Sequence, residues 1–225
     1  MKIQPDVLPE NFELLAEGSQ SIIYNFGTGL LLKVSKNERV SEEKVRAIDS
    51  MLCCVGSHFA LNSYQGVACI SKLQSWGTLY EKVLGDKLSS YLYDNCGSST
   101  IKIQQKLMPI LKDVVEALIH LDQKNYPHTD ISEHNILVSS INQKPVIIDY
   151  ETPGPIDKEL LEDSRLTSRQ KFGEMLQRLI PEQEGINEKL ALMIDRCCSN
   201  EPLEKYGWRD IQTTIAGLQP LRFQF

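Results

Sequence analysis

The chain has 225 residues and a formal net charge of −6, so its composition lacks the basic surface typical of proteins that bind nucleic acid. No apolar run is long enough to span a membrane, and the N-terminal sequence MKIQPDVLPENF lacks the apolar core of a signal peptide. The six cysteines have neither zinc-ligand spacing nor the density of a disulfide scaffold. These features predict reduced thiols and a cytoplasmic, reducing location, and they are compatible with delivery into another cell.

Three short apolar runs near the N-terminus predict β-strands. They are Leu14-Leu15, Ile22-Ile23-Tyr24 and the run from Leu30 to Val34, and glycines between them supply the turns. Lys33 lies near the end of the third run. The first part of the chain is therefore expected to form three short strands joined by glycine turns.

Two helices are predicted from apolar residues at helical spacing. The first starts at Ser41, which can cap the helix, and it carries Glu42 and Glu43 in its first turn. The second runs from Ile101 to about Gln123, and Pro109 should kink or break it.

The most informative stretch is YPHTDISEHNILVSSINQKPVIIDYETPG, residues 126–154. Asp130 and Asn135 lie five residues apart in a loop that precedes the apolar run Ile136–Val138. Asp149 follows a second apolar run, Val146–Ile148, as a carboxylate at the end of a buried strand would. Two carboxylates and one amide provide the hard oxygen ligands that Mg²⁺ prefers when it also binds substrate phosphates.

These residues resemble the catalytic and metal loops of the protein-kinase family, H-R-D-x-x-x-x-N followed by D-F-G. Here the two loops read His128-Thr129-Asp130…Asn135 and Asp149-Tyr150-Glu151. The segment DISEHNIL, followed later by IID, resembles the corresponding segments of the atypical RIO kinases still more closely. The resemblance implies an α+β, two-lobed fold, in which residues 1–83 form a lobe with a small antiparallel sheet and residues 84–225 form a mainly helical lobe.

The resemblance also implies how the first lobe would bind ATP. Gly18 stands at the middle glycine of the kinase glycine-rich loop, and Ser19 and Ser21 could add hydroxyl donors to the phosphates. Lys33 takes the place of the lysine that holds the α- and β-phosphates. Glu81 and Val83 take the places of the residues whose backbone contacts adenine.

An acid on the helix that begins at Ser41 would pair with Lys33. Glu43 is the first choice for this acid, and Glu42 and Asp49 are its rivals.

The same resemblance implies that Asp130 would accept or orient the proton of the acceptor hydroxyl, while Asn135 and Asp149 would hold Mg²⁺. Thr129 replaces the arginine that engages a phosphorylated activation loop. Only the segment from Glu151 to about Leu166 is expected to precede the next helical run, SRQKFGEMLQRLI. The sequence therefore predicts a compact kinase without a long activation loop.

The favoured function is an atypical serine/threonine protein kinase that uses ATP and Mg²⁺, with a protein substrate and a possible regulatory protein partner. Two alternatives stay open. One is a small-molecule phosphotransferase similar to aminoglycoside or choline kinases, although these typically carry H-G-D-x-H-x-x-N, where this chain has Thr129 and Ser132. The other is a nucleotide-binding pseudokinase that acts through a partner protein.

Overall fold

The computed structural model describes residues 13–27, 29–36, 40–70, 75–150, 158–180 and 186–218. The chain is α+β and divides into two compact units. Unit 1 contains residues 1–58 and 62–83, and unit 2 contains residues 59–61 and 84–225. The main boundary lies between Val83 and Leu84, and the short segment Phe59–Leu61 belongs to unit 2 although unit 1 surrounds it in the sequence.

Unit 1 is built on a five-stranded antiparallel sheet with the strand order β1-β2-β3-β5-β4. The first three strands occur where the apolar runs predicted them, and β4 and β5 complete the sheet. Their bounds are Glu13–Glu17 (β1), Ser21–Asn25 (β2), Leu30–Ser35 (β3), Tyr64–Ile70 (β4) and Ser75–Glu81 (β5).

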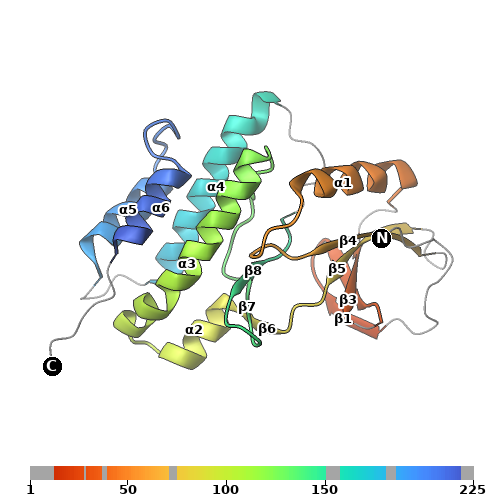
Figure 1. Cartoon of the computed structure of the whole chain (residues 1–225), viewed down its shortest axis with the longest axis horizontal. Coiled ribbons are helices and arrows are strands. Elements are labelled where there is room, and N and C mark those ends of the chain that lie inside the picture. Colours follow the sequence, from red (N-terminus) through yellow and green to blue (C-terminus); the bar gives the residue numbers. More distant parts are fainter. Residues whose placement is uncertain are drawn as a thin grey trace. The chain divides into compact units, whose positions relative to one another are not determined.

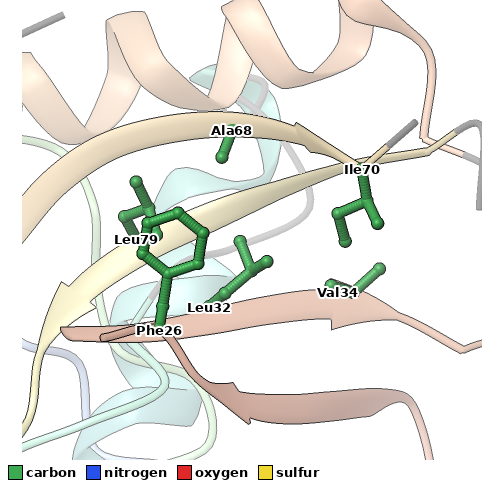
Figure 2. Packing of buried hydrophobic residues seen from close by; sticks show 6 residues of the cluster. All are labelled: Phe26, Leu32, Val34, Ala68, Ile70 and Leu79. Carbon is green, nitrogen blue, oxygen red and sulfur yellow. The ribbon is translucent and has the colours of Figure 1, made fainter. Parts of the chain in front are cut away.

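One face of this sheet carries a buried apolar cluster, in which the side chains point toward one another (Figure 2). Leu32 opposes Leu79 across β3 and β5, and alternate residues along each strand point to the same face. Gly77 leaves room for this packing, because a Cβ at that position would lie 2.6 Å from the Lys33 carbonyl oxygen. The cluster consists of Phe26, Leu32, Val34, Ala68, Ile70 and Leu79.

Helix α1, Glu42–Val55, contacts β4 and β5 and runs along the sheet of unit 1 (Figure 1). The Ser41 hydroxyl accepts a hydrogen bond from the Lys44 amide at 3.2 Å, so the predicted N-cap is confirmed. The helix ends before Gly56, whose φ of 72° few other residues adopt at low cost. Its apolar stripe is buried, as the helical spacing predicted, through Val45, Met51, Leu52 and Val55.

Unit 2 contains a three-stranded antiparallel sheet with the order β6-β7-β8, formed by Gly85–Lys87, Ile136–Ser139 and Pro145–Ile147. Gly85 is required by close approach, because a Cβ there would overlap the Val138 carbonyl. The segment Phe59–Leu61 joins this sheet beside β8. Leu61 forms a parallel bridge to Ile147, and the Ile147 amide donates to the Ala60 carbonyl at 2.8 Å.

Five helices accompany this sheet in unit 2 (Figure 1). The longest, α3, is continuous through Pro109, so the proline does not break it. Helix α3 packs against α6, and α4 packs against α5. The bounds are Leu88–Cys96 (α2), Thr100–Gln123 (α3), Lys158–Leu179 (α4), Glu188–Cys198 (α5) and Trp208–Gly217 (α6).

Helix α4 begins at Lys158, about ten residues before the helical run that the sequence analysis expected. The expectation that the connecting segment continues to about Leu166 is therefore wrong. The residues between Lys158 and Leu166 are mostly good helix formers without a clean apolar stripe, which is why their periodicity gave a weak signal. The hydroxyl-bearing residues Ser164 and Thr167 therefore lie inside helix α4 rather than in a connecting segment, and both are half-buried.

A buried arginine ties α4 to the connection between α5 and α6. Arg169 has no exposed surface and pairs with backbone rather than with a carboxylate. Its guanidinium donates to the carbonyl oxygens of Tyr206 at 2.6 Å, Ser199 at 2.8 Å and Glu201 at 2.7 Å. Burial lowers the pKa of Arg169, and Glu201 is among the groups that oppose this shift. Arg169 thus satisfies three carbonyl groups of one connection.

In the part of the chain that the structure describes, no helix combines the length and apolarity needed to cross a membrane.

Candidate functional site

The loop between α3 and β7 is organised around a buried histidine. His128 is only 2 % exposed. Its Nδ1 accepts a hydrogen bond from the Asp130 amide, and its Nε2 lies 3.3 Å from the Ile148 carbonyl oxygen. An amide can only donate and a carbonyl can only accept, so these contacts fit a neutral ring that carries its proton on Nε2. His128 therefore links the start of the loop to the end of β8.

Within the same loop, Asn135 is bonded to Asp130. The Asn135 Nδ2 donates to the Asp130 backbone carbonyl at 2.9 Å and to its Oδ2 at 3.2 Å. Both partners are acceptors, which identifies the side-chain atom as the amide nitrogen. The Asn135 side-chain oxygen is then the atom with lone pairs to offer to a cation. Asp130 itself is exposed, and Asn135 is half-buried.

Asp149 follows β8 in an uncommon backbone conformation, with φ of 56°. Aspartate and asparagine tolerate this left-handed region better than most residues. The residue before it is held on both sides, because the Ile148 amide donates to the Asn135 carbonyl at 2.9 Å while the Ile148 carbonyl faces His128. Strained backbone that its neighbours hold in place is often found at functional sites. The Asp149 side chain is exposed.

The residues of unit 2 therefore meet part of the requirement for a magnesium site. Asn135 and Asp149 offer oxygen atoms of the kind that Mg²⁺ prefers. The backbone of Asn135 is hydrogen-bonded to Ile148, the residue just before Asp149. Among the residues that the structure describes, no group of three or more His, Cys, Asp or Glu side chains could hold a metal ion. Bound substrate phosphates would have to complete the coordination of a Mg²⁺ ion held by these two side chains.

In unit 1, Gly18 lies in the turn between β1 and β2, where its amide donates to the Ser21 carbonyl at 2.8 Å. Ser19 is exposed in the same turn, and Ser21 is the first residue of β2. A Cβ on Gly18 would meet the Ser21 carbonyl oxygen at 3.5 Å, which is an ordinary contact. Nothing in the fold of this turn requires a glycine.

We therefore expect Gly18→Ala to leave the free energy of unfolding within about 0.5 kcal/mol of the wild type. Gly77→Ala provides the contrast, because its Cβ would lie 2.6 Å from a backbone oxygen and should cost about 1–3 kcal/mol. Urea unfolding of both variants measures the difference. A large loss of stability in Gly18→Ala would mean that the turn needs its glycine for folding.

Lys33 lies in the middle of the sheet, where it pairs with Ile23 on β2 and Thr78 on β5. It is half-buried and points to the face opposite the apolar cluster, because Leu32 and Val34 on either side belong to that cluster. Tyr80 shares the Lys33 face by strand alternation, and Tyr64 opposes Tyr80 on the neighbouring strand.

A hydrogen bond links helix α1 to this face, because Tyr64 Oη donates to Asp49 Oδ1 at 2.5 Å. Of the three acids considered for Lys33, Asp49 is half-buried, whereas Glu42 and Glu43 are exposed in the first turn. Glu42 is bonded to Arg46. Asp49 is thus the acid of α1 that the structure places against the sheet.

The two residues expected at the adenine lie at the end of unit 1. Glu81 is the last residue of β5, it is exposed, and its amide donates to the Ser63 carbonyl at 2.9 Å. Val83 follows in an irregular segment and is half-buried. Glu81 therefore ends a strand, and Val83 lies two residues beyond that end.

Two arginines of α4 contact residues of this loop or of the end of α3, and no local sequence pattern predicts either contact. Arg165 donates to Asp122 Oδ1 at 2.8 Å, at the end of α3, and to Asn125 Oδ1 at 3.1 Å, near the start of the loop. Arg178 forms a two-pronged ion pair with Glu133 inside it. Burial alone would raise the pKa of Glu133, but the hydrogen bonds from Arg178 help to lower it below its usual value. The acidic residue was visible in the sequence, but its partner lies too far along the chain to be recognised.

Neither the scan against protein-family models nor the search of curated proteins gave a match, so the family resemblance depends on the motifs alone.

Proposed function

We propose that this protein is an ATP-dependent phosphotransferase of the protein-kinase type, which transfers the γ-phosphoryl group of ATP to a serine or threonine hydroxyl of a protein. The observation that carries the proposal is the bonded pair Asp130–Asn135, next to the left-handed Asp149. A carboxylate for the acceptor and two oxygen ligands for a metal are the groups that phosphoryl transfer needs.

Each residue has a distinct role in this proposal. Asp130 orients the acceptor hydroxyl and accepts its proton, and its exposed carboxylate suits contact with a second substrate. Asn135 uses its amide nitrogen to hold Asp130, so its oxygen serves the metal together with Asp149. When bound, Mg²⁺ supplies positive charge that stabilises the transferring phosphoryl group.

The residues of unit 1 take the nucleotide roles. The Lys33 backbone is fixed between two neighbouring strands, and its ammonium group neutralises phosphate charge. The turn at Gly18, Ser19 and Ser21 offers amide and hydroxyl donors for phosphate oxygens. The backbones of Glu81 and Val83 serve the adenine base. Asp49, held by Tyr64, is the acid of α1 that we assign to Lys33 in place of Glu43.

Nucleotide binding gives the most direct test. A ligand that binds only the folded state at a hundredfold excess over its Kd stabilises it by about 2.7 kcal/mol. For a chain of this size, that corresponds to a rise in Tm of roughly 5–10 °C with millimolar ATP and Mg²⁺. We expect Asp149→Asn to lose the magnesium-dependent part of this rise, because it removes the ligand charge but keeps a residue that tolerates the left-handed backbone.

The control is Asp94→Asn, which neutralises an exposed acid on α2 and should keep the full shift. Labelled ATP with protein, sugar and amino-alcohol acceptors then identifies the class of acceptor. A wild-type protein with no change in Tm at millimolar ATP and Mg²⁺ would contradict the proposal.

A further inference from the structure

The ion pair between Arg178 and Glu133 connects α4 to the middle of the loop that carries Asp130 and Asn135. Arg178 Nε lies 3.0 Å from Glu133 Oε1, and Arg178 Nη2 lies 3.0 Å from Oε2. The Glu133 side chain is 10 % exposed and that of Arg178 is 48 % exposed. A two-pronged contact of this kind fixes direction as well as distance, because the guanidinium and carboxylate planes must match.

Glu133 occupies the centre of a tight turn. The Asn135 amide donates to the Ser132 carbonyl at 3.0 Å, so Glu133 and His134 are the two central residues between these groups. Holding the Glu133 side chain therefore holds the turn that delivers Asn135. The Asn135 side chain in turn bonds the carbonyl and the carboxylate of Asp130. A side-chain ion pair thus joins Arg178 to Glu133, the backbone of the turn joins Glu133 to Asn135, and side-chain hydrogen bonds join Asn135 to Asp130.

The burial of Glu133 distinguishes this pair from an ordinary surface contact. On the same helix, Lys171 and Glu174 form an ion pair at 2.8 Å, but each side chain is 43 % exposed. Exposed pairs of that kind contribute little, because water competes for both charges. Breaking the Arg178 pair instead leaves a nearly buried carboxylate that has lost its arginine and keeps His134 Nε2 at 3.8 Å, which favours a rearrangement of the turn around Glu133.

We propose that Arg178 and Glu133 are positioning residues for phosphoryl transfer, which set the orientation of Asn135 and, through it, of Asp130. The inference rests on the proposed function for its chemical consequence. Its structural part concerns the free protein and can be tested without nucleotide.

The first experiment measures hydrogen exchange of the free protein. The reporting amides are those of Asn135, bonded to Ser132, and of Ile148, bonded to the Asn135 carbonyl. We expect Arg178→Gln to speed exchange of both at least tenfold, and we expect Glu174→Gln to leave both unchanged. Exchange in α6 serves as the reference for general loss of stability. Unchanged loop exchange in Arg178→Gln would overturn the inference, whatever the activity.

The second experiment measures transfer kinetics as a function of magnesium concentration. Loss of a residue that orients a metal ligand typically costs about 10–100-fold in activity or metal affinity. We expect Arg178→Gln to lower kcat by at least tenfold and to raise the Mg²⁺ concentration at half-maximal rate. A general loss of folding would lower the active fraction but would leave that concentration unchanged.

Glu133→Gln keeps the side-chain volume and tests the same pair from the other side. The double variant should match Arg178→Gln in loop exchange, kcat and magnesium dependence, because each single change already breaks the same interaction. Additive losses, or faster loop exchange with unchanged kcat and magnesium dependence, would overturn the positioning role. A wild-type protein without transfer activity, in which Arg178→Gln still loosens the loop, would support the structural link and contradict the proposed function.

Discussion

Asp130→Ala is expected to remove phosphoryl transfer while nucleotide affinity stays close to that of the wild type. The carboxylate that receives the acceptor proton is lost, which typically costs ~10²–10⁴ in rate. Of the contacts around Asp130, the hydrogen bond from Asn135 to Oδ2 is lost, but the backbone contacts do not need this side chain. The Asp130 amide still donates to His128, and its carbonyl still accepts from Asn135 at 2.9 Å. The Asn135 side chain therefore keeps its hydrogen bond to the Asp130 backbone carbonyl, which holds it in place within the loop.

Transfer of labelled phosphate measures the rate, and the ATP-induced change in Tm measures affinity in the same preparation. Asp94→Ala, an exposed acid of α2, should match the wild type in both assays. Two results would contradict the role of Asp130. One is full transfer by Asp130→Ala, and the other is a loss of affinity as large as the loss of rate.

Arg169→Met should lower the free energy of unfolding by about 3 kcal/mol, the largest stability effect that we expect for a single side chain. Hydrogen bonds from a charged group contribute about 1.5–3 kcal/mol each, and three of them are lost. Relief of the buried charge offsets part of this loss. The free energy of unfolding of Arg169→Lys should lie between those of the wild type and Arg169→Met. One ammonium group cannot reproduce the planar arrangement of donors that reaches three carbonyls.

Urea unfolding followed by tryptophan fluorescence measures this effect, since Trp208 is buried in unit 2 and contacts Phe172. Arg209→Met is the matched control, because Arg209 is exposed on α6 and its loss should change stability by no more than about 0.5 kcal/mol. Equal stability of Arg169→Met and the wild type would mean that the three carbonyls find other donors, such as water.

The elements with local signals could be predicted from the sequence. Helix α1 has its cap, its acidic first turn and its apolar stripe within fifteen residues, and the structure has each of them. The first three strands of unit 1 followed from short apolar runs and glycine turns, and the α+β class followed from the resemblance of the loop motifs. The pairing of Phe59–Leu61 with β8 has no local signal, because its partner is distant in the sequence and the contact is made through backbone.

The candidate site divides in the same way. Asp130 and Asn135 belong to one loop, so their spacing predicted that they lie close together, and the structure joins them. Glu133 and Arg178 depend on where α4 packs, which no pattern in either segment specifies. The assignment of ATP, Mg²⁺ and a protein acceptor stays a prediction, because it concerns molecules that the chain must bind rather than contacts within it.

The left-handed backbone of Asp149 has a consequence for how this protein can evolve. Asparagine and glycine are the other residues that accept a φ near 56° with little strain. Either is reached from an aspartate codon by one nucleotide change, and either removes the negative charge without disturbing the turn. In the proposed kinase, a lineage can therefore lose a metal ligand in a single mutation while it keeps a folded protein that still displays the same surface.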